Sequence, residues 1–229
     1  MPDIKKFELS PSIAILVCGV LIAGSIIFVN LHPGQPAVAA DPNQLPANAN
    51  VPAPNANDHI RGSLSAPIVL VEYSDFQCPY CQMVHPTLKR LVDESNGKIA
   101  WVYREYPLTS LHPQARPAAL AAECIEEQLG NDGFWKFADT IFADQTKMSP
   151  EYYAQLAAQF GADPAQFASC VSSEKYAGKI ASQSLEAQSN GGNGTPFTVI
   201  VGAGVQVPVS GAQPYENFKA VIDAMLARQ

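Results

Sequence analysis

Apolar and polar positions follow two different periods along the chain, and together they predict an α/β domain. Four short apolar runs rich in β-branched residues are typical of buried strands: 67–71, 99–103, 197–201 and 205–209. A helical pattern follows the first run, a longer one covers about 113–185, and an amphipathic stretch at 215–227 follows the last run. The predicted order is strand, helix, strand, a helical insertion, then strand, strand, helix.

A longer uncharged segment precedes this domain. Residues 13–31 carry no charged side chain, and as a helix they would span roughly 28 Å, close to the thickness of a bilayer's hydrocarbon core. Two lysines precede the segment and no Lys or Arg follows it before Arg61, so the positive-inside rule places residues 1–12 in the cytoplasm. We expect an uncleaved transmembrane anchor. A signal peptide cleaved within 37–39, with secretion to the periplasm, is the alternative.

Prolines, alanines and asparagines dominate residues 32–59, which predicts an extended linker and leaves 60–229 as the folded part. The chain is 47% apolar and 15% charged, which suits a domain with a substantial core. Its formal net charge is −7, without a long basic cluster, and this disfavours nucleic acid as a partner. Within the helical insertion, Ser149-Pro150 and Asp163-Pro164 predict helix starts, each an N-cap residue followed by proline.

The candidate chemistry lies at the start of the first predicted helix. Cys78-Pro79-Tyr80-Cys81 follows the first strand closely, and Pro79 suits the first helical position because its missing N–H is not needed there. Unpaired N–H groups and the partial positive charge of a helix N-terminus favour a thiolate at Cys78. We therefore predict Cys78 as the nucleophile and Cys81, one turn further in, as the resolving thiol of a redox-active disulfide.

This order of elements, with a Cys-X-X-Cys at the first helix, resembles the thioredoxin fold, and the helical insertion resembles that of the DsbA family of thiol oxidoreductases. The motif residues are Glu72, the Cys78–Cys81 motif and Gly194-Thr195-Pro196-Phe197. The resemblance implies that Pro196 is cis and lies against the active-site disulfide, and that Thr195 presents backbone atoms to an extended substrate peptide. The expected fold is α/β, thioredoxin-like with an inserted helical subdomain, preceded by one transmembrane helix.

Glu72 lies near the end of a predicted buried strand, where a carboxylate is costly unless it is solvated or paired. A raised pKa and a proton relay toward Cys81 fit both burial and the resemblance. The alternative is an edge carboxylate paired with a lysine. His85 and His112 are weaker candidates, for which packing or a capping role is the plainer interpretation.

Two further cysteines, Cys124 and Cys170, stand 46 positions apart in the helical insertion. Structural zinc usually requires a second closely spaced pair, so a metal site is disfavoured and we expect no metal or cofactor. We infer a structural disulfide between the two residues, which export would permit. Two buried free thiols remain the alternative.

The expected function is a membrane-tethered, extracytoplasmic thiol-disulfide oxidoreductase that introduces disulfide bonds into reduced exported proteins. The resemblance implies reoxidation by a membrane quinone-linked thiol oxidase of the DsbB or vitamin K epoxide reductase (VKOR) kind. Tyr80 stands where strongly oxidising members often carry His, so a disulfide reductase or isomerase is one alternative. A non-catalytic peptide-binding or chaperone module is the other. An isomerase would usually need a dimerisation domain, which the proline-rich stretch does not resemble, and we expect a monomer.

Overall fold

The computed structural model describes residues 49–228. The expected cytoplasmic segment 1–12, the expected anchor 13–31 and most of the expected linker lie outside the described residues. Among residues 49–228, none of the helices combines the length and the apolar character needed to cross a bilayer.

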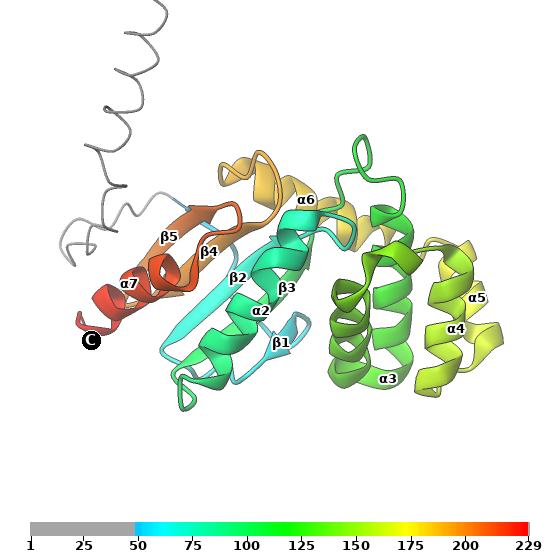
Figure 1. Ribbon diagram of the computed structural model, residues 1–229, viewed down its shortest axis with the longest axis horizontal. Coiled ribbons are helices and arrows are strands. Elements are labelled where there is room, and N and C mark those ends of the chain that lie inside the picture. Colours follow the sequence, from blue (N-terminus) through cyan, green and yellow to red (C-terminus); the bar gives the residue numbers. More distant parts are fainter. Residues whose placement is uncertain (1–48, 229) are drawn as a thin grey trace, which may run out of the picture. The chain divides into compact units, whose positions relative to one another are not determined.

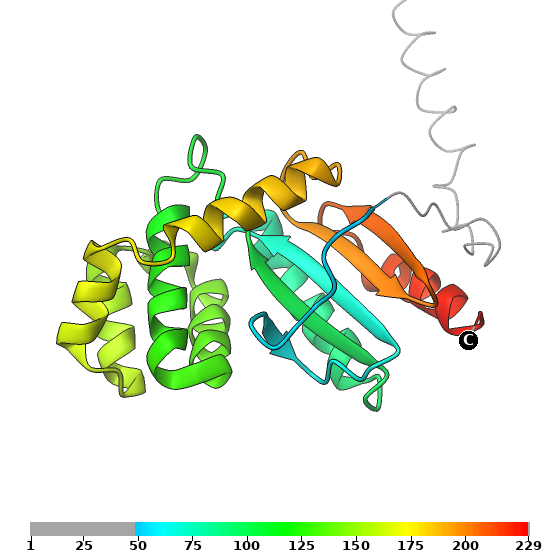
Figure 2. The same ribbon diagram turned by 180° about the vertical axis from the view of Figure 1, so that it is seen from behind.

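A five-stranded sheet forms the centre of the described domain, in the order β1-β3-β2-β4-β5 (Figures 1 and 2). The two central strands, β2 (Ile68–Ser74) and β3 (Ile99–Glu105), are parallel, as a strand-helix-strand unit requires. Antiparallel partners complete the sheet: β1 (His59–Arg61) beside β3, β4 (Phe197–Gly202) beside β2, and β5 (Val205–Ser210) beside β4. The predicted thioredoxin-like α/β fold is thus confirmed in its architecture.

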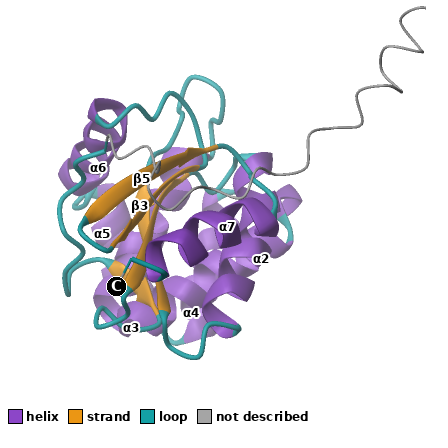
Figure 3. Ribbon diagram, turned by 90° about the vertical axis from the view of Figure 1, so that its left-hand side faces the viewer, coloured by secondary structure: helices purple, strands orange, loops and turns teal. Residues whose placement is uncertain are grey.

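Helices cover both faces of this sheet, which explains why β2 and β3 read as continuous apolar runs (Figure 3). On one face, α2 (Pro79–Asp93) and α7 (Tyr215–Leu226) bury their apolar stripes against the central strands. On the other face lies α6 (Ala177–Ser189), whose Ala187 packs into a second apolar cluster with residues of β2, β3 and β4. The site at the start of α2 is therefore carried by a rigid, fully packed element.

Three helices form the subdomain that extends from one side of the sheet: α3 (Ala115–Ala143), α4 (Pro150–Phe160) and α5 (Pro164–Ser172) (Figure 1). The predicted helix starts are confirmed, because the side chains of Ser149 and Asp163 accept hydrogen bonds from backbone N–H groups in the first turns of α4 and α5. The helical axis of α3 breaks at Gly130, whose φ of +68° lies outside the helical region. The last helix of the predicted insertion, α6, covers the sheet rather than extending the subdomain.

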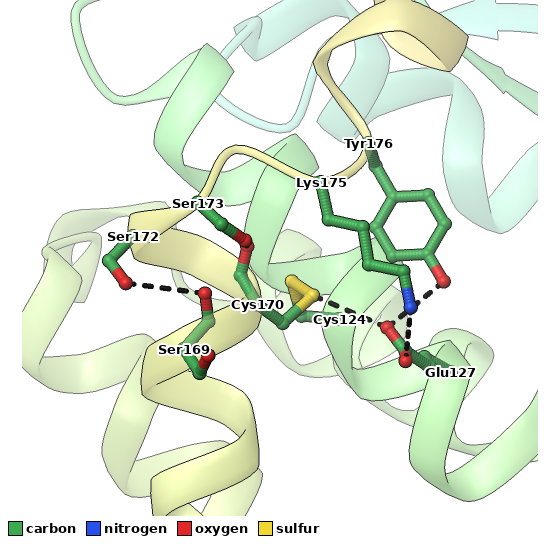
Figure 4. Close-up of a disulfide and its surroundings, with 8 residues drawn as sticks. All are labelled: Cys124, Glu127, Ser169, Cys170, Ser172, Ser173, Lys175 and Tyr176. Carbon is green, nitrogen blue, oxygen red and sulfur yellow. Dashed lines mark hydrogen bonds and ion pairs between the residues drawn. A yellow bond between two sulfur atoms is a disulfide. The ribbon is translucent and has the colours of Figure 1, made fainter.

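A disulfide between Cys124 of α3 and Cys170 of α5 joins two helices of this subdomain (Figure 4). Beside it, the Glu127 carboxylate accepts hydrogen bonds from Lys175 and from the Tyr176 hydroxyl. Closing a loop with a sequence separation of 46 stabilises the fold by about 4 kcal/mol in the chain-entropy description. The cross-link therefore stabilises the helical subdomain.

Packing against the sheet already includes Val51, which lies within residues 32–59, the segment expected to be an extended linker. Val51 is 2% exposed, and its backbone N–H and carbonyl both bond the Gln206 side chain on β5, at 2.7 and 3.0 Å. The chain then crosses the α6 face of the sheet (Figure 2) and pairs with β3 through β1. The proline-rich composition gave no sign of this packing, because its partners lie on strands distant in sequence.

Candidate active site

Cys78 occupies the N-cap position of α2, where the chain turns from β2 into the helix. Its backbone is extended, and its N–H donates to the Asp75 carbonyl at 3.0 Å, which closes the turn. Pro79 follows at the start of the helix, where no backbone donor is needed. Both Cys78 and Cys81 are free thiols and buried, and Cys78 lies at the positive end of the helix.

Side chains from distant segments fix this turn. The Asp75 carboxylate is 1% exposed and accepts hydrogen bonds from Gln77 N–H (2.8 Å), Leu108 N–H (2.9 Å) and His112 Nδ1 (2.7 Å). From beyond α3, the Gln145 amide donates to the carbonyl oxygens of Phe76 (2.8 Å) and Cys78 (3.0 Å). Of these supports the sequence singled out only His112, for packing or capping, and it did not predict the roles of Asp75 and Gln145. An acid directly after the buried strand was the one available signal for Asp75, and nothing local marked Gln145.

The loop before β4 approaches the same sulfur atom. The Thr195–Pro196 peptide bond is cis, and the Thr195 carbonyl oxygen lies 3.3 Å from Cys78 Sγ. The Thr195 hydroxyl is buried and has no hydrogen-bond partner in the described part of the chain. Two motifs separated by 117 residues, Cys78-Pro79-Tyr80-Cys81 and Gly194-Thr195-Pro196-Phe197, therefore meet at one point.

The two thiols differ sharply in acidity. A hydrogen bond from the Cys81 thiol is the largest influence that lowers the pKa of Cys78 to about 6; burial opposes it, while the Thr195 side chain and the N–H groups of Cys81 and Tyr80 assist it. Burial raises the pKa of Cys81 well above its usual range, helped by its hydrogen bond to Cys78 and by the negative charge of Glu72. Near neutral pH, Cys78 can thus attack as a thiolate while Cys81 keeps its proton.

Glu72 lies on the central strand β2 and is 1% exposed, so it is not an edge carboxylate. The indole N–H of Trp101 donates to its Oε2 at 3.0 Å, and among its described contacts no lysine pairs with it. Burial raises the pKa of Glu72 to about 7, against the lowering influence of the nearby Ser74 hydroxyl and of the hydrogen bond from Trp101. A carboxyl that exchanges its proton near neutral pH, close to a buried thiol, can serve proton transfer.

The remaining candidates lie at the rim or away from the thiols. Tyr80 is 59% exposed on the first turn of α2, beside the equally exposed Met83, so both can contact a partner. His85 is buried and hydrogen-bonded to Asp139 through Nε2 at 2.7 Å, and His112 supports the Asp75 turn. Within residues 49–228, no three His, Cys, Asp or Glu side chains are grouped so as to hold a metal ion.

Comparison with known proteins places this geometry in a family. Residues 54–224 match the family model described as thioredoxin. The chain belongs to this thioredoxin family. The match begins before residue 60, in agreement with the packed N-terminal segment.

Solved structures identify the branch of the thioredoxin family. The chain is 29% identical to Pseudomonas aeruginosa DsbA2, with a TM-score of 0.61, over 76% of this chain and 95% of that one. Two further similarities, at lower identity, concern the fold. They are Bacillus subtilis BdbD in its oxidised form (20% identity, TM-score 0.67, 79% and 99% covered) and Wolbachia pipientis alpha-DsbA1 (21%, 0.65, 76% and 94%). The predicted DsbA-like membership and the oxidoreductase class are confirmed.

Curated sequence relatives match over a shorter part of their own length. The chain is 34% identical over 152 residues to Na(+)/H(+) antiporter NhaA 3 of Salinispora tropica, covering 66% of this chain and 23% of that protein. A similar match, at 31% identity, covers 23% of NhaA 1 of Mycolicibacterium vanbaalenii. This thioredoxin-family chain thus spans about a quarter of the length of the curated relatives it matches.

Proposed function

We propose that the protein introduces disulfide bonds into exported proteins by dithiol–disulfide exchange through Cys78 and Cys81. A substrate thiolate attacks Cys78 Sγ, the Cys78–Cys81 bond breaks, and Cys81 leaves with the electron pair and takes up a proton. A second substrate thiolate then attacks the substrate sulfur of the mixed disulfide and displaces Cys78 as a thiolate. Two electrons pass from the substrate dithiol to the enzyme disulfide.

The unequal acidity of the two thiols carries this proposal. A thiolate is a good leaving group when its pKa is low, so Cys78 leaves readily in the second step. The same low pKa stabilises the reduced enzyme, and a disulfide whose reduced form is stabilised is a stronger oxidant. Disulfide donation therefore fits the geometry better than reduction, although Tyr80 brings no cation to the site.

The surroundings of Cys78 suit an extended substrate. The Thr195 carbonyl lies beside the sulfur at the entrance to β4, where the backbone can pair with a peptide. Pro79 and Tyr80 follow Cys78 and are exposed, and the Tyr80 ring offers an apolar contact. Backbone pairing with few side-chain demands allows many unfolded proteins to serve as substrates.

The proposed location is outside the cytoplasm, with the domain tethered by residues 13–31 or released to the periplasm after cleavage. The Cys124–Cys170 disulfide supports an oxidising compartment, because cytoplasmic reductants keep most thiols reduced. We assign reoxidation to a membrane quinone-linked thiol oxidase of the DsbB or VKOR kind, which accepts the two electrons, and we take the monomer as the active form. The DsbA-like membership supports the extracytoplasmic location and the membrane reoxidase.

The direct test replaces the resolving thiol. In the full chain, Cys81→Ala leaves a Cys78 thiolate that attacks existing disulfides of exported proteins and releases one of the two substrate sulfurs as a thiol. The resulting mixed disulfides cannot be resolved, so covalent complexes with exported proteins should accumulate and disappear on reduction. Cys78→Ala with Cys81→Ala is the matched control and should trap nothing. Absence of trapped partners in the single variant, with peptide binding unchanged, would leave a non-catalytic binding module.

The direction of exchange requires the equilibrium potential of the Cys78–Cys81 couple against glutathione. Disulfide donors lie toward about −120 mV and reductases toward about −270 mV. We expect a value above about −200 mV, where glutathione-like thiols reduce the enzyme readily. A value near that of thioredoxin would instead assign the protein as a reductase.

A further inference from the structure

Beneath α2, polar side chains gather on the sheet face that also carries the apolar core. The parallel register pairs Glu72 with Tyr103 and Ser74 with Glu105, on the adjacent strands β2 and β3. Side chains two residues apart on a strand share a face, so these four lie together. Each is at most 1% exposed. Their strands' apolar residues on the same face, such as Leu70 and Trp101, pack in one cluster with Cys81 of α2.

Most of these polar atoms have no partner. Within residues 49–228, no hydrogen bond is made by the Ser74 hydroxyl, the Tyr103 hydroxyl or either carboxyl oxygen of Glu105. The Thr198 hydroxyl, on the residue of β4 paired with Glu72, is also unpartnered. Buried polar groups that serve stability are normally hydrogen-bonded, because an unpaired one costs about 1–3 kcal/mol.

A neighbouring acid shows the contrast. Glu123 of α3 is as deeply buried as Glu105, but its carboxylate meets His59 at 2.9 Å and Lys179 at 2.7 Å. Glu123 therefore has the contacts of a structural ion pair, and Glu105 does not. The Glu105 backbone N–H donates a hydrogen bond to the Gln183 side chain, so it is the carboxyl group of Glu105 that lacks a partner.

Ser74 connects this group of side chains to the resolving thiol. Within residues 49–228 its hydroxyl makes no hydrogen bond, but it lies close enough to Glu72, Tyr103 and Cys81 to lower the pKa of each. On its other side, its register partner is Glu105. A hydroxyl can accept one proton while it donates another, so Ser74 is suited to pass a proton between the carboxyl and the sulfur.

We propose that Glu105 is a second buried acid, besides Glu72, that supplies a proton to the departing sulfur of Cys81 through the Ser74 hydroxyl. This inference rests on the proposed function. When a substrate thiolate bonds to Cys78 Sγ, the Cys78–Cys81 bond breaks and Cys81 takes the electron pair. Ser74 gives its proton to the Cys81 thiolate and takes that of Glu105. The Glu105 carboxylate then regains a proton from water.

Two acids with different acidities extend the working pH range. Glu72 is mostly ionised above about pH 7. The pKa of Glu105 is raised well above its usual value, first by burial and then by the carboxylates of Glu123 on α3, Asp75 after β2 and Glu72. Lys179 of α6 opposes this rise, and Tyr103 is the titratable neighbour on β3 itself. As the second acid, Glu105 has to hold its proton at pH values where Glu72 has lost it, and the pH profiles of the variants test this.

The test follows the first step of reduction as a function of pH. Oxidised full-length native protein and its Glu105→Gln, Ser74→Ala and Glu72→Gln variants are mixed with dithiothreitol between pH 6 and 9. The reaction is quenched in acid, and free Cys78 and Cys81 are counted by alkylation and mass spectrometry. Dividing each variant rate by the native rate at the same pH removes the ionisation of the reagent. Glu151→Gln, an exposed charge change on α4, is the control.

We expect the Glu105→Gln ratio to stay near one at pH 6 and to fall at least about tenfold by pH 8.5. Glu72→Gln should show the opposite trend, with its largest loss at pH 6, and Ser74→Ala should follow Glu105→Gln at high pH. A Glu105→Gln ratio independent of pH would overturn the inference, because a purely structural acid changes all rates alike. If Glu105→Gln does not fold, the Ser74→Ala profile decides. A native disulfide that dithiothreitol leaves intact would instead defeat the proposed function itself.

Discussion

The two faces of β2 and β3 bury polar groups in opposite ways. On the α6 face, the register partners Tyr73 and Arg104 are fully paired. Arg104 is 3% exposed and binds Asp58 through two hydrogen bonds (2.8 and 3.0 Å), the Glu186 carboxylate and the Pro52 carbonyl. On the α2 face, Ser74, Tyr103 and Glu105 keep unpartnered atoms.

The polar groups on the α6 face are buried with partners that stabilise the fold, whereas those on the α2 face are buried without partners beside the reactive thiols. The paired network joins the N-terminal segment and α6 to the sheet, so its charges have fixed partners and no role in proton transfer. The unpaired groups lie beside the reactive thiols, where a free oxygen can exchange protons. Residues that are neighbours in sequence therefore serve different purposes, according to the face on which they lie.

Arg104→Met should have the largest effect, on stability. Removing the guanidinium leaves the buried Asp58 and the half-buried Glu186 without a counter-charge, and we expect the free energy of unfolding to fall by about 3–5 kcal/mol. Urea denaturation of the oxidised protein measures it. Arg116→Met, which breaks an exposed pair with Glu174, is the control and should cost at most about 1 kcal/mol. Equal losses in the two variants would contradict the assigned role of the paired face.

Glu72→Gln should raise the free energy of unfolding above neutral pH, the opposite of the effect expected for Arg104→Met. The folded-state pKa of about 7 lies above the ordinary value of 4.5, so the native protein loses stability as pH rises from 4.5 through 7. Glutamine avoids this loss. Relative to the native protein, the variant should therefore gain about 3 kcal/mol of unfolding free energy between pH 4 and pH 8. Urea titrations of both proteins at the two pH values test this. A difference in unfolding free energy between variant and native protein that does not change with pH would contradict the raised pKa of Glu72.

The sequence predicted most of the fold but not this polar face. Apolar runs at 67–71 and 99–103 located the two central strands, yet β2 continues to Ser74 and β3 to Glu105. Hydrophobicity cannot distinguish a polar strand end that helices cover from the start of a loop. Only the pairing of β2 with β3, and the helices packed over them, reveal that these ends are buried.

The reactive cysteines were easier to anticipate than their supports. A Cys-X-X-Cys between a buried strand and a helical pattern is a local signal, and so is Glu72 six residues earlier. The three-residue strand β1 and the packing of Val51 depend on contacts with β3 and β5, which no local pattern encodes. For the same reason, Gln145 could not be assigned to the active-site turn.

Thr195→Ala tests whether the unpartnered hydroxyl next to Cys78 acts on the sulfur. The thiolate absorbance of the reduced protein should titrate with a midpoint of about 6. Loss of the hydroxyl, whose proximity lowers the Cys78 pKa, should raise that midpoint by up to about one pH unit. Thr140→Ala, on α3 with its hydroxyl bonded to the Lys136 carbonyl, should leave it unchanged. An unshifted midpoint in Thr195→Ala would remove this hydroxyl from the chemistry.

Tyr73→Phe and Tyr103→Phe form the most closely matched pair, because both side chains are fully buried on adjacent strands and lose only a hydroxyl. The Tyr73 hydroxyl bonds Glu186 and Arg104, which remain paired with each other in its absence, so we expect a loss of about 1 kcal/mol. The Tyr103 hydroxyl has no partner, and its removal should leave the free energy of unfolding unchanged or raise it slightly. Equal losses by urea denaturation would mean that the Tyr103 hydroxyl is as well satisfied as that of Tyr73, and the two faces would then differ in charge but not in pairing.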